Sequence, residues 1–376
     1  MIVVLTQCFP PVLGGIENLM AGLAGALSGL DRKVIVLADG HRDRGEAAYD
    51  RRLDYPVRRI SGVKPWRQRR KAAALGELLD TGNVRAIFTD SWKSAEHAIP
   101  KLREHDVPLV CLAHGNDVLA EDDARRRHRI SRILSSATRI AANSVNTAER
   151  VQALGVDPAR IAVVNPGVTP PERPERDVVE SVAARIGERE HLLLTVARIE
   201  PRKGQDQVLR SMPALLSDYP ELTYAIAGDG PYREQLEQLA RHLSIARRVR
   251  FLGRVSEAEK SALLELADLF VMPVRDDVAT RSVEGFGIAY VEAAFRALPT
   301  VAGRSGGVAD AVLDGVTGLL CDGNDAGDVE RTIRDCLADP GRRTQLGIAA
   351  RQRAEREFTW PVAAKRYLAC LEPIAS

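Results

Sequence analysis

Three shortages in the sequence each exclude a class of protein. Aromatic residues make up only 5% of the 376 residues, which argues against a surface built to stack exposed bases, so we expect no nucleic acid partner. The five cysteines are odd in number and far apart, with no Cys-x-x-Cys pair and no Cys/His cluster at metal-ligand spacing. We therefore expect free thiols, as in a cytoplasmic protein, rather than a disulfide framework or a zinc site.

Long apolar runs are also lacking. The run Leu192–Ala197 is typical, whereas a membrane-spanning helix needs about 20 apolar residues. The chain opens on the apolar residues Ile2–Leu5 with no basic segment before them, so we expect no signal peptide. Hydrophobic residues make up 45% and charged residues 28%, as in ordinary globular proteins. At about 150 residues per domain, the length predicts two or three domains.

The chain has no large excess of charge of either sign, since 53 basic and 51 acidic residues leave a net charge of +2. Residues 1–170 carry 25 Lys or Arg against 19 Asp or Glu, a net of +6, and the remainder carries a net of −4. A basic first half favours an anionic partner such as a lipid surface, although ordinary scatter also explains so small a difference. The basic segment Lys64–Lys71 has two interpretations: a contact with anionic lipid, or the solvated start of a helix.

Short apolar segments alternate with amphipathic ones, which predicts parallel sheets covered by helices on both faces. The predicted strands are Ile2–Leu5, Lys33–Ala38, Arg85–Thr89, Leu109–Ala113, Arg139–Asn143, Leu192–Ala197, Thr223–Ala227, Val249–Leu252, Leu269–Met272 and Thr300–Ala302. The proline-rich, charged segment 165–174 breaks the alternation and is interpreted as a linker between two doubly wound halves. Such folds bind ligands at the carboxyl ends of their strands, which predicts a site in a cleft between the halves.

Two motifs in the first half lie where a ligand would be expected. Gly14-Gly15 stands between the first strand and a helix, where backbone amides can approach an anion, although a tight turn explains the pair equally well. The loop lacks the G-x-G-x-x-G pattern of a nicotinamide-binding site. His114-Gly115 follows a predicted strand, and only its position raises it above the more common structural histidine.

The second half carries stronger signals. Arg198 and Lys203 stand five residues apart after a predicted strand, a pair that suits a diphosphate, although a solvated basic loop would look the same. Glu284 precedes the turn Gly285-Phe286-Gly287, and a helix bearing Glu292 follows. Carboxylates eight residues apart lie at most about 12 Å apart along a helix axis. One could hold a sugar and the other a ribose, with phosphates at the positive end of the helix.

Taken in order, these motifs resemble those of the retaining family-4 glycosyltransferases. The resemblance covers nearly the whole chain, and its motifs are Gly14-Gly15, His114-Gly115, Arg198 with Lys203, Glu284 with Glu292, Ser305-Gly306-Gly307 and Asp314–Gly318. Within the family, Tyr49–Tyr55 and Met272–Arg275 look closest to the bacterial phosphatidylinositol-mannoside mannosyltransferases. Thr169, where close relatives have an aspartate, and the loop Asp276–Arg281, which lacks a glycine run, depart from this pattern and leave sugar and acceptor open.

The resemblance implies an α/β protein of GT-B fold, with two doubly wound Rossmann-like domains facing across a cleft. We expect an acceptor-side domain at 1–168, on which a C-terminal helix at about 358–376 packs back, and a nucleotide-sugar-binding domain at 169–357. By similarity, the Gly14-Gly15 loop approaches the donor phosphates and the acceptor, and His114 lines the donor sugar.

The same resemblance assigns roles in the second domain. Arg198 and Lys203 would bind the diphosphate and stabilise it as a leaving group. The amides of the glycine turn, with Glu284, would hold the donor hexose, and Glu292 would hold the ribose. The residues expected beside the base are Gly253, Arg254 and Val255, with Lys260 as a further candidate.

The implied function is transfer of a hexose from a nucleotide diphosphate donor, with GDP-mannose the first candidate, to a lipid or saccharide acceptor. Fixed cations at the departing diphosphate would lower the barrier, and without an Asp-x-Asp motif we expect no metal and no cofactor. Attack on the same face of the sugar would need no protein nucleophile. We expect a cytoplasmic enzyme, and its contact with the inner face of the membrane is a hypothesis. The alternatives are a UDP-sugar transferase of the same fold, a sugar-nucleotide epimerase and a non-catalytic sugar-nucleotide-binding module.

Overall fold

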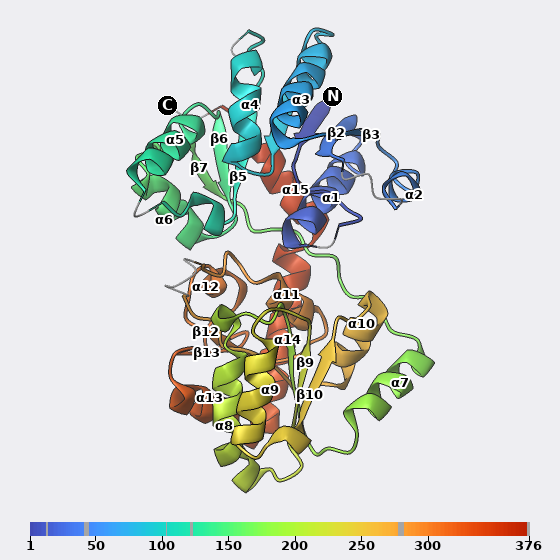
Figure 1. Ribbon diagram of the computed structural model, residues 1–376, viewed down its shortest axis with the longest axis vertical. Coiled ribbons are helices and arrows are strands. Elements are labelled where there is room, and N and C mark those ends of the chain that lie inside the picture. The colour runs from blue at the N-terminus through green and yellow to red at the C-terminus, as the bar shows by residue number, and fades with distance from the viewer. Residues whose placement is uncertain (13, 41–44, 103, 121–122, 277–281, 374–376) are drawn as a thin grey trace. The chain divides into compact units, whose positions relative to one another are not determined.

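The computed structural model describes residues 1–376 except 13, 41–44, 103, 121–122, 277–281 and 374–376 (Figure 1). All of the divergent loop Asp276–Arg281 apart from Asp276 therefore lies outside the described residues. The chain divides into two compact units: Met1–Val168 together with Phe358–Ser376, and Thr169–Glu357. Each unit contains one sheet of parallel strands, so the α/β expectation is confirmed.

The sheet of the first unit has the strand order β3-β2-β1-β4-β5-β6-β7 in the described residues. Its strands are β1 (Ile2–Leu5), β2 (Val34–Asp39), β3 (Val57–Ile60), β4 (Ala86–Thr89), β5 (Leu109–Ala113), β6 (Arg139–Ala142) and β7 (Ile161–Val163). The helices are α1 (Gly15–Ser28), α2 (Glu46–Asp50), α3 (Lys64–Leu79), α4 (Trp92–Leu102), α5 (Ala124–Leu134), α6 (Val145–Ala153) and α15 (Trp360–Ala369).

Alternate residues of β1 face two separate cores. Val3 and Leu5 pack with helices α3, α4 and α5, whereas Ile2 and Val4 pack with α1 and α15. A strand that is buried on both faces has no polar side, which is why the central strands appear in the sequence as continuous apolar runs.

The C-terminal helix α15 belongs to the first unit and lies beside α1 (Figure 1). Its first residue, Trp360, packs against Gly22 and Gly167, where a Cβ on either glycine would collide with the indole ring. The backbone N–H of Val168 donates to the carbonyl of Phe358 at 2.7 Å. The segment that begins α15 is therefore held by close packing of Trp360 as well as by a backbone hydrogen bond.

The second unit contains a sheet with the strand order β10-β9-β8-β11-β12-β13 in its described residues. The strands are β8 (Leu192–Val196), β9 (Thr223–Ala227), β10 (Val249–Gly253), β11 (Leu269–Met272), β12 (Thr300–Gly303) and β13 (Leu319–Cys321). The helices are α7 (Arg176–Ile186), α8 (Gln205–Asp218), α9 (Arg233–His242), α10 (Glu257–Leu266), α11 (Ile288–Phe295), α12 (Val308–Ala311), α13 (Ala326–Ala338) and α14 (Pro340–Glu357).

The strand order reverses once in each sheet, between β1 and β4 and between β8 and β11. In doubly wound folds, ligands bind at the carboxyl ends of the strands on either side of such a reversal, because the connecting loops diverge there. The topology therefore marks one ligand-binding position in each unit.

Two negative findings apply to the described residues only. None of their helices is both long and apolar enough to cross a bilayer. Nor do any three of their His, Cys, Asp or Glu side chains gather as metal ligands. All five cysteines fall within this part of the chain, and each is a free thiol.

Candidate active site

Lys203 of the second unit lies at the reversal between β8 and β11. It ends a short 3₁₀ turn, Pro201–Lys203, and is followed by Gly204, which has a φ of +74°. A Cβ at Gly204 would collide with the carbonyl oxygen of Pro273, just after β11, so only glycine fits this close approach. The turn is further fixed by the backbone N–H of Arg275, which donates to the carbonyl of Arg202 at 2.9 Å.

Lys203 forms an ion pair with Glu284, so the two residues lie in one site. The Lys203 Nζ lies 2.5 Å from Glu284 Oε2, and Arg202 donates to the same oxygen at 2.8 Å. The three side chains are between 11% and 14% exposed. Burial alone would raise the pKa of Glu284, but the charges of Lys203 and Arg202 outweigh it and hold that pKa below its usual value. The carboxyl group is therefore ionised and held between two cations.

Arg202 is a member of this cluster that sequence reasoning missed. It bonds to Glu284 and also donates through Nε to Glu200 Oε2 at 3.0 Å. Arg198, which the sequence singled out instead, is 74% exposed and bonds to Glu200 Oε1 at 2.9 Å. Within the part of the chain that the structure describes, Arg198 is thus linked to the cluster through Glu200 alone. The position of Arg202 directly beside Lys203 is the signal that could have found it.

The backbone around Glu284 is held by a neighbouring turn. The N–H of Gly307 donates to the carbonyl of Glu284 at 2.8 Å, and Gly306, with a φ of +56°, leaves no room there for a Cβ. On the other side, Phe286 is buried and Gly287, with a φ of +95°, precedes the first turn of α11. The amides of Gly285, Phe286 and Gly287 thus lead into the positive end of a helix.

Glu292 and the predicted base-side residues lie outside the Lys203–Glu284 cluster in the described part of this unit. Among the described residues, Glu292, whose side chain is 19% exposed, pairs with Lys260 at 2.7 Å rather than with the Lys203–Glu284 cluster. Burial raises the pKa of Glu292, although Lys260 opposes the shift. Gly253 ends β10, and its carbonyl accepts from the N–H of Gly228 at 2.7 Å; the next two residues are Arg254, which is exposed, and Val255.

In the first unit, Asp90 organises the reversal between β1 and β4. Its carboxylate accepts from Thr6 Oγ1 at 2.9 Å and from the backbone N–H of Gln7 at 2.7 Å. Its carbonyl oxygen lies 2.8 Å from Nε2 of His114. A carbonyl oxygen can only accept, so Nε2 of His114 is the donor in this contact. Asp90 was also missed, although a single acid at the end of an apolar strand is a usable signal.

The glycines predicted in this unit begin α1. Gly14 precedes the helix and Gly15 is its first residue, and the carbonyl of Gly14 accepts from the N–H of Asn18 at 3.1 Å. A Cβ at Gly15 would meet no atom within 4 Å, so the space above this residue is open. At Gly14, by contrast, a Cβ would collide with the carboxylate of Glu17, which lies against the start of α1.

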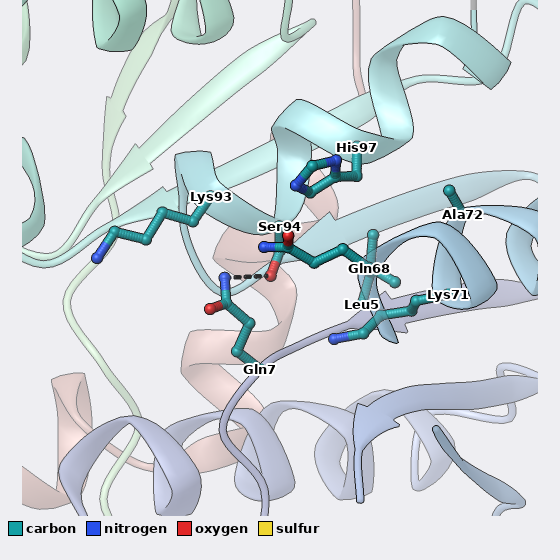
Figure 2. A pocket seen from close by; sticks show the side chains of 8 residues that line it. All are labelled: Leu5, Gln7, Gln68, Lys71, Ala72, Lys93, Ser94 and His97. Carbon is teal, nitrogen blue, oxygen red and sulfur yellow. Dashed lines mark hydrogen bonds between the residues drawn. The ribbon is translucent and has the colours of Figure 1, made fainter. Parts of the chain in front are cut away.

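A small hollow, open to solvent, lies beside the same reversal and is called the pocket below (Figure 2). In Figure 2 the amide of Gln7 points to the hydroxyl of Ser94, to which it donates at 3.3 Å, and His97 lies one turn further along α4. The remaining lining residues are Leu5, Gln68, Lys71, Ala72 and Lys93. Burial lowers the pKa of His97; the charge of Glu96 opposes this shift and that of Arg129 adds to it, and the net lowering favours the neutral ring at pH 7.

The two lysines of the pocket differ in what they can offer a ligand. Lys71 is buried, pairs with Asp39 and donates to the carbonyl of Thr6 at 2.6 Å. Lys93 is exposed and lies 5.7 Å from the ring of Trp92. The pocket therefore combines neutral hydrogen-bonding groups with one accessible cation.

Two doubly wound units, each with polar groups at its reversal, define a glycosyltransferase of GT-B fold. Residues 13–171 match the family model described as Glycosyltransferase Family 4, and residues 180–353 match the one described as Glycosyl transferases group 1. The chain belongs to the family-4 glycosyltransferases and is an enzyme.

Named relatives span almost the full chain. The GDP-mannose-dependent alpha-(1-6)-phosphatidylinositol monomannoside mannosyltransferase of Mycolicibacterium smegmatis is 31% identical over 94% of this chain and 94% of its own. The corresponding monoacylated-substrate enzyme of Corynebacterium glutamicum is 27% identical, covering 96% of this chain and 95% of its own. The crystal structure of Anabaena HepE in complex with UDP has a TM-score of 0.81 at 20% identity, covering 98% and 99% of the chains, and supports the fold.

Proposed function

We propose that this enzyme transfers mannose from GDP-mannose to a glycolipid acceptor of the phosphatidylinositol-mannoside kind, with retention of configuration and without a metal ion. The buried Arg202–Lys203–Glu284 cluster at the second reversal carries the proposal, because it joins a cation for a diphosphate to a carboxylate for sugar hydroxyls. The two mannosyltransferases that match almost the whole chain support the choice of donor and acceptor.

The leaving group is stabilised by positive charge. As the bond between the anomeric carbon and the phosphate oxygen breaks, negative charge builds on the diphosphate, and preorganised cations lower the barrier. Lys203 supplies a buried ammonium group, and Arg198 supplies an exposed guanidinium group that can turn from Glu200 to a phosphate. The amides before α11 add hydrogen bonds at the positive end of the helix.

Glu284 binds the hexose and does not act as the base. Its lowered pKa makes it a weak proton acceptor, but its ionised oxygens accept hydrogen bonds from sugar hydroxyls. In the proposed same-face step, the acceptor hydroxyl bonds to the anomeric carbon as the phosphate leaves, and its proton passes to the departing phosphate. His114 contacts the donor sugar, and Glu292, beside Lys260, accepts from the ribose.

The acceptor side of the reaction is assigned to the first unit. The Gln7–Ser94–His97 pocket offers neutral hydrogen-bonding groups for a hydroxyl-rich head group, and Lys93 faces its anionic substituent. The same unit carries an exposed basic helix start: Trp66 is 64% exposed, and Lys64, Arg69 and Arg70 are exposed beside it. We assign this helix start to peripheral contact with an anionic membrane.

The membrane contact is tested with vesicles containing anionic phospholipid. Each exposed cation contributes about 1 kcal/mol near such a surface, so replacing Lys64, Arg69 and Arg70 by Gln should release most of the bound protein at low salt. Replacing Lys71 is not an equivalent test, because its charge is already paired with Asp39. Equal binding of the triple variant and the parent protein would overturn the assignment.

Donor choice is tested by thermal shift with GDP, UDP, ADP and their sugar conjugates, with and without EDTA. A ligand that binds the folded state raises stability by mass action, so the preferred nucleotide gives the largest shift. A GDP-selective shift and GDP-mannose turnover that EDTA leaves unchanged are the expected results. A UDP-selective shift would retain the fold and discard mannose, and loss of turnover in EDTA would discard metal independence.

A further inference from the structure

Arg59, on the edge strand β3, is a buried cation that the proposed chemistry does not use. Its side chain is only 9% exposed. Nε lies 2.8 Å from one oxygen of Asp50 and a terminal nitrogen lies 2.7 Å from the other, which is a two-pronged contact. A second terminal nitrogen reaches Glu46 at 3.3 Å. Both carboxylates come from the short helix α2, so β3 and α2 are joined through this guanidinium group.

The same guanidinium group reaches the loop between β1 and α1. One terminal nitrogen donates to the carbonyl oxygen of Pro10, and the group lies 5.5 Å from the centre of the Phe9 ring. Phe9 in turn meets Tyr49 of α2 edge-on, with ring centres 6.2 Å apart. Arg59 thus holds the middle of this loop by a hydrogen bond and by a ring contact.

The loop depends on such an external donor because of its composition. Pro10 and Pro11 have no N–H, so neither residue can donate a backbone hydrogen bond that would fix the loop. Its beginning is fixed by Asp90, which accepts from Thr6 and Gln7, and its end is fixed where Gly14 precedes α1. Arg59 supplies the anchor between these two ends.

We infer that Arg59 is a positioning residue for glycosyl transfer: through Pro10 and Phe9 it holds the loop that leads to Gly14 and Gly15, the residues assigned above to the donor phosphates and the acceptor. The inference rests on the proposed role of those glycines. Arg59 itself touches no substrate. Its effect is to keep the loop in one arrangement before substrates bind, since misplacement of a positioning segment by about 1 Å can cost roughly a hundredfold in rate.

The neighbouring residue on the same strand provides a matched control. Arg58 is 48% exposed and pairs with Glu77, itself 63% exposed, at 2.7 Å. Arg58→Gln and Arg59→Gln therefore remove the same charge from adjacent positions of β3, but only the second removes a contact with the loop. Arg59→Lys keeps a positive charge beside Asp50. It loses the planar guanidinium group, which bonds to Asp50 and to the Pro10 carbonyl simultaneously.

The test combines hydrogen exchange with turnover. We expect amides of residues 8–18 to exchange at least about tenfold faster in Arg59→Gln than in Arg58→Gln, because the loop opens locally. Release of GDP from GDP-mannose should fall by at least about tenfold in kcat with KM for the donor little changed, and Arg59→Lys should recover part of the loss. GDP should still raise the melting temperature of Arg59→Gln, because the nucleotide is assigned to the other unit.

Two results would overturn the inference: unchanged loop exchange in Arg59→Gln, or faster exchange with turnover equal to that of Arg58→Gln. A rate loss that only follows the unfolded fraction of Arg59→Gln would also overturn it, since the residue would then be structural. Failure of the proposed function gives a different pattern. The parent protein would then release no GDP from GDP-mannose, while loop exchange would still report whether Arg59 anchors the loop.

Discussion

Replacing Glu284 by Gln removes one charge from a buried group of three and keeps the side chain's shape. Lys203 and Arg202, 2.5 and 2.8 Å from the lost carboxylate oxygen, are left facing an amide. Removing one partner of a buried pair costs about 3–5 kcal/mol. Arg202 keeps Glu200 as a partner, so we expect the lower end, about 3 kcal/mol of unfolding free energy.

The assay is calorimetric unfolding with and without GDP. For a unit of this size, about 3 kcal/mol corresponds to a fall of roughly 6–12 °C in melting temperature. Because the variant leaves the two cations in excess, a diphosphate should restore stability, so GDP should raise the melting temperature of Glu284→Gln more than that of the parent. Transfer to acceptor should nevertheless be lost, since the carboxylate that we propose holds the hexose is gone.

The dependence of the unfolding free energy on pH in the acid range gives a second test of Glu284. The folded-state pKa of Glu284 is lowered, so its contribution is fully present above the pKa of an unfolded glutamate and is lost as pH falls through the lower, folded value. The parent should therefore lose more stability than Glu284→Gln on acidification through that window. Near-normal transfer, or an unchanged melting temperature at neutral pH, would refute the reasoning about the cluster.

Two other substitutions test the binding of the diphosphate by Lys203 and the packing of α15 by Trp360. Lys203→Met should lose both transfer and most of the GDP-induced thermal shift, in contrast with Glu284→Gln, and a retained shift would show that the diphosphate binds elsewhere. Trp360→Ala should lower the unfolding free energy by about 2–4 kcal/mol, because it leaves the grooves at Gly22 and Gly167 unfilled, and denaturant unfolding would show it. An unaltered unfolding midpoint would mean that α15 is held by its other contacts.

The central strands were predictable because burial on both faces leaves a strong pattern. Leu109–Ala113 was expected and is observed as β5 with the same bounds. The strands that sequence reasoning missed, β3, β7 and β13, are three of the four edge strands of the two sheets; the fourth, β10, was predicted. An edge strand is covered less completely and can carry charge, as Val57–Ile60 does with two arginines, so its apolar run is interrupted.

For the candidate site in the second unit, the sequence indicated which types of residue to consider but not which of them contact one another. Lys203 and Glu284 are 81 positions apart, and they meet because β8 and β11 are neighbours, which no local spacing reveals. Arg198 and Arg202 are chemically identical and lie on one loop. Which of them turns inward is decided by the 3₁₀ turn at Pro201–Lys203 and by the close approach of Gly204 to Pro273.

The charges around Lys203 suggest that Arg198, although exposed, contributes to binding of the diphosphate. Glu200, Arg202, Lys203 and Glu284 sum to zero charge, so the buried cluster by itself attracts a diphosphate weakly, and Arg198 supplies the excess positive charge. Its 74% exposed side chain contributes about 0–1 kcal/mol to folding through Glu200. Arg198→Gln should therefore leave the melting temperature within a few degrees while weakening GDP binding and its salt dependence, both measurable by titration calorimetry. Unchanged GDP affinity would mean that the incoming diphosphate displaces Glu284 from Lys203 instead.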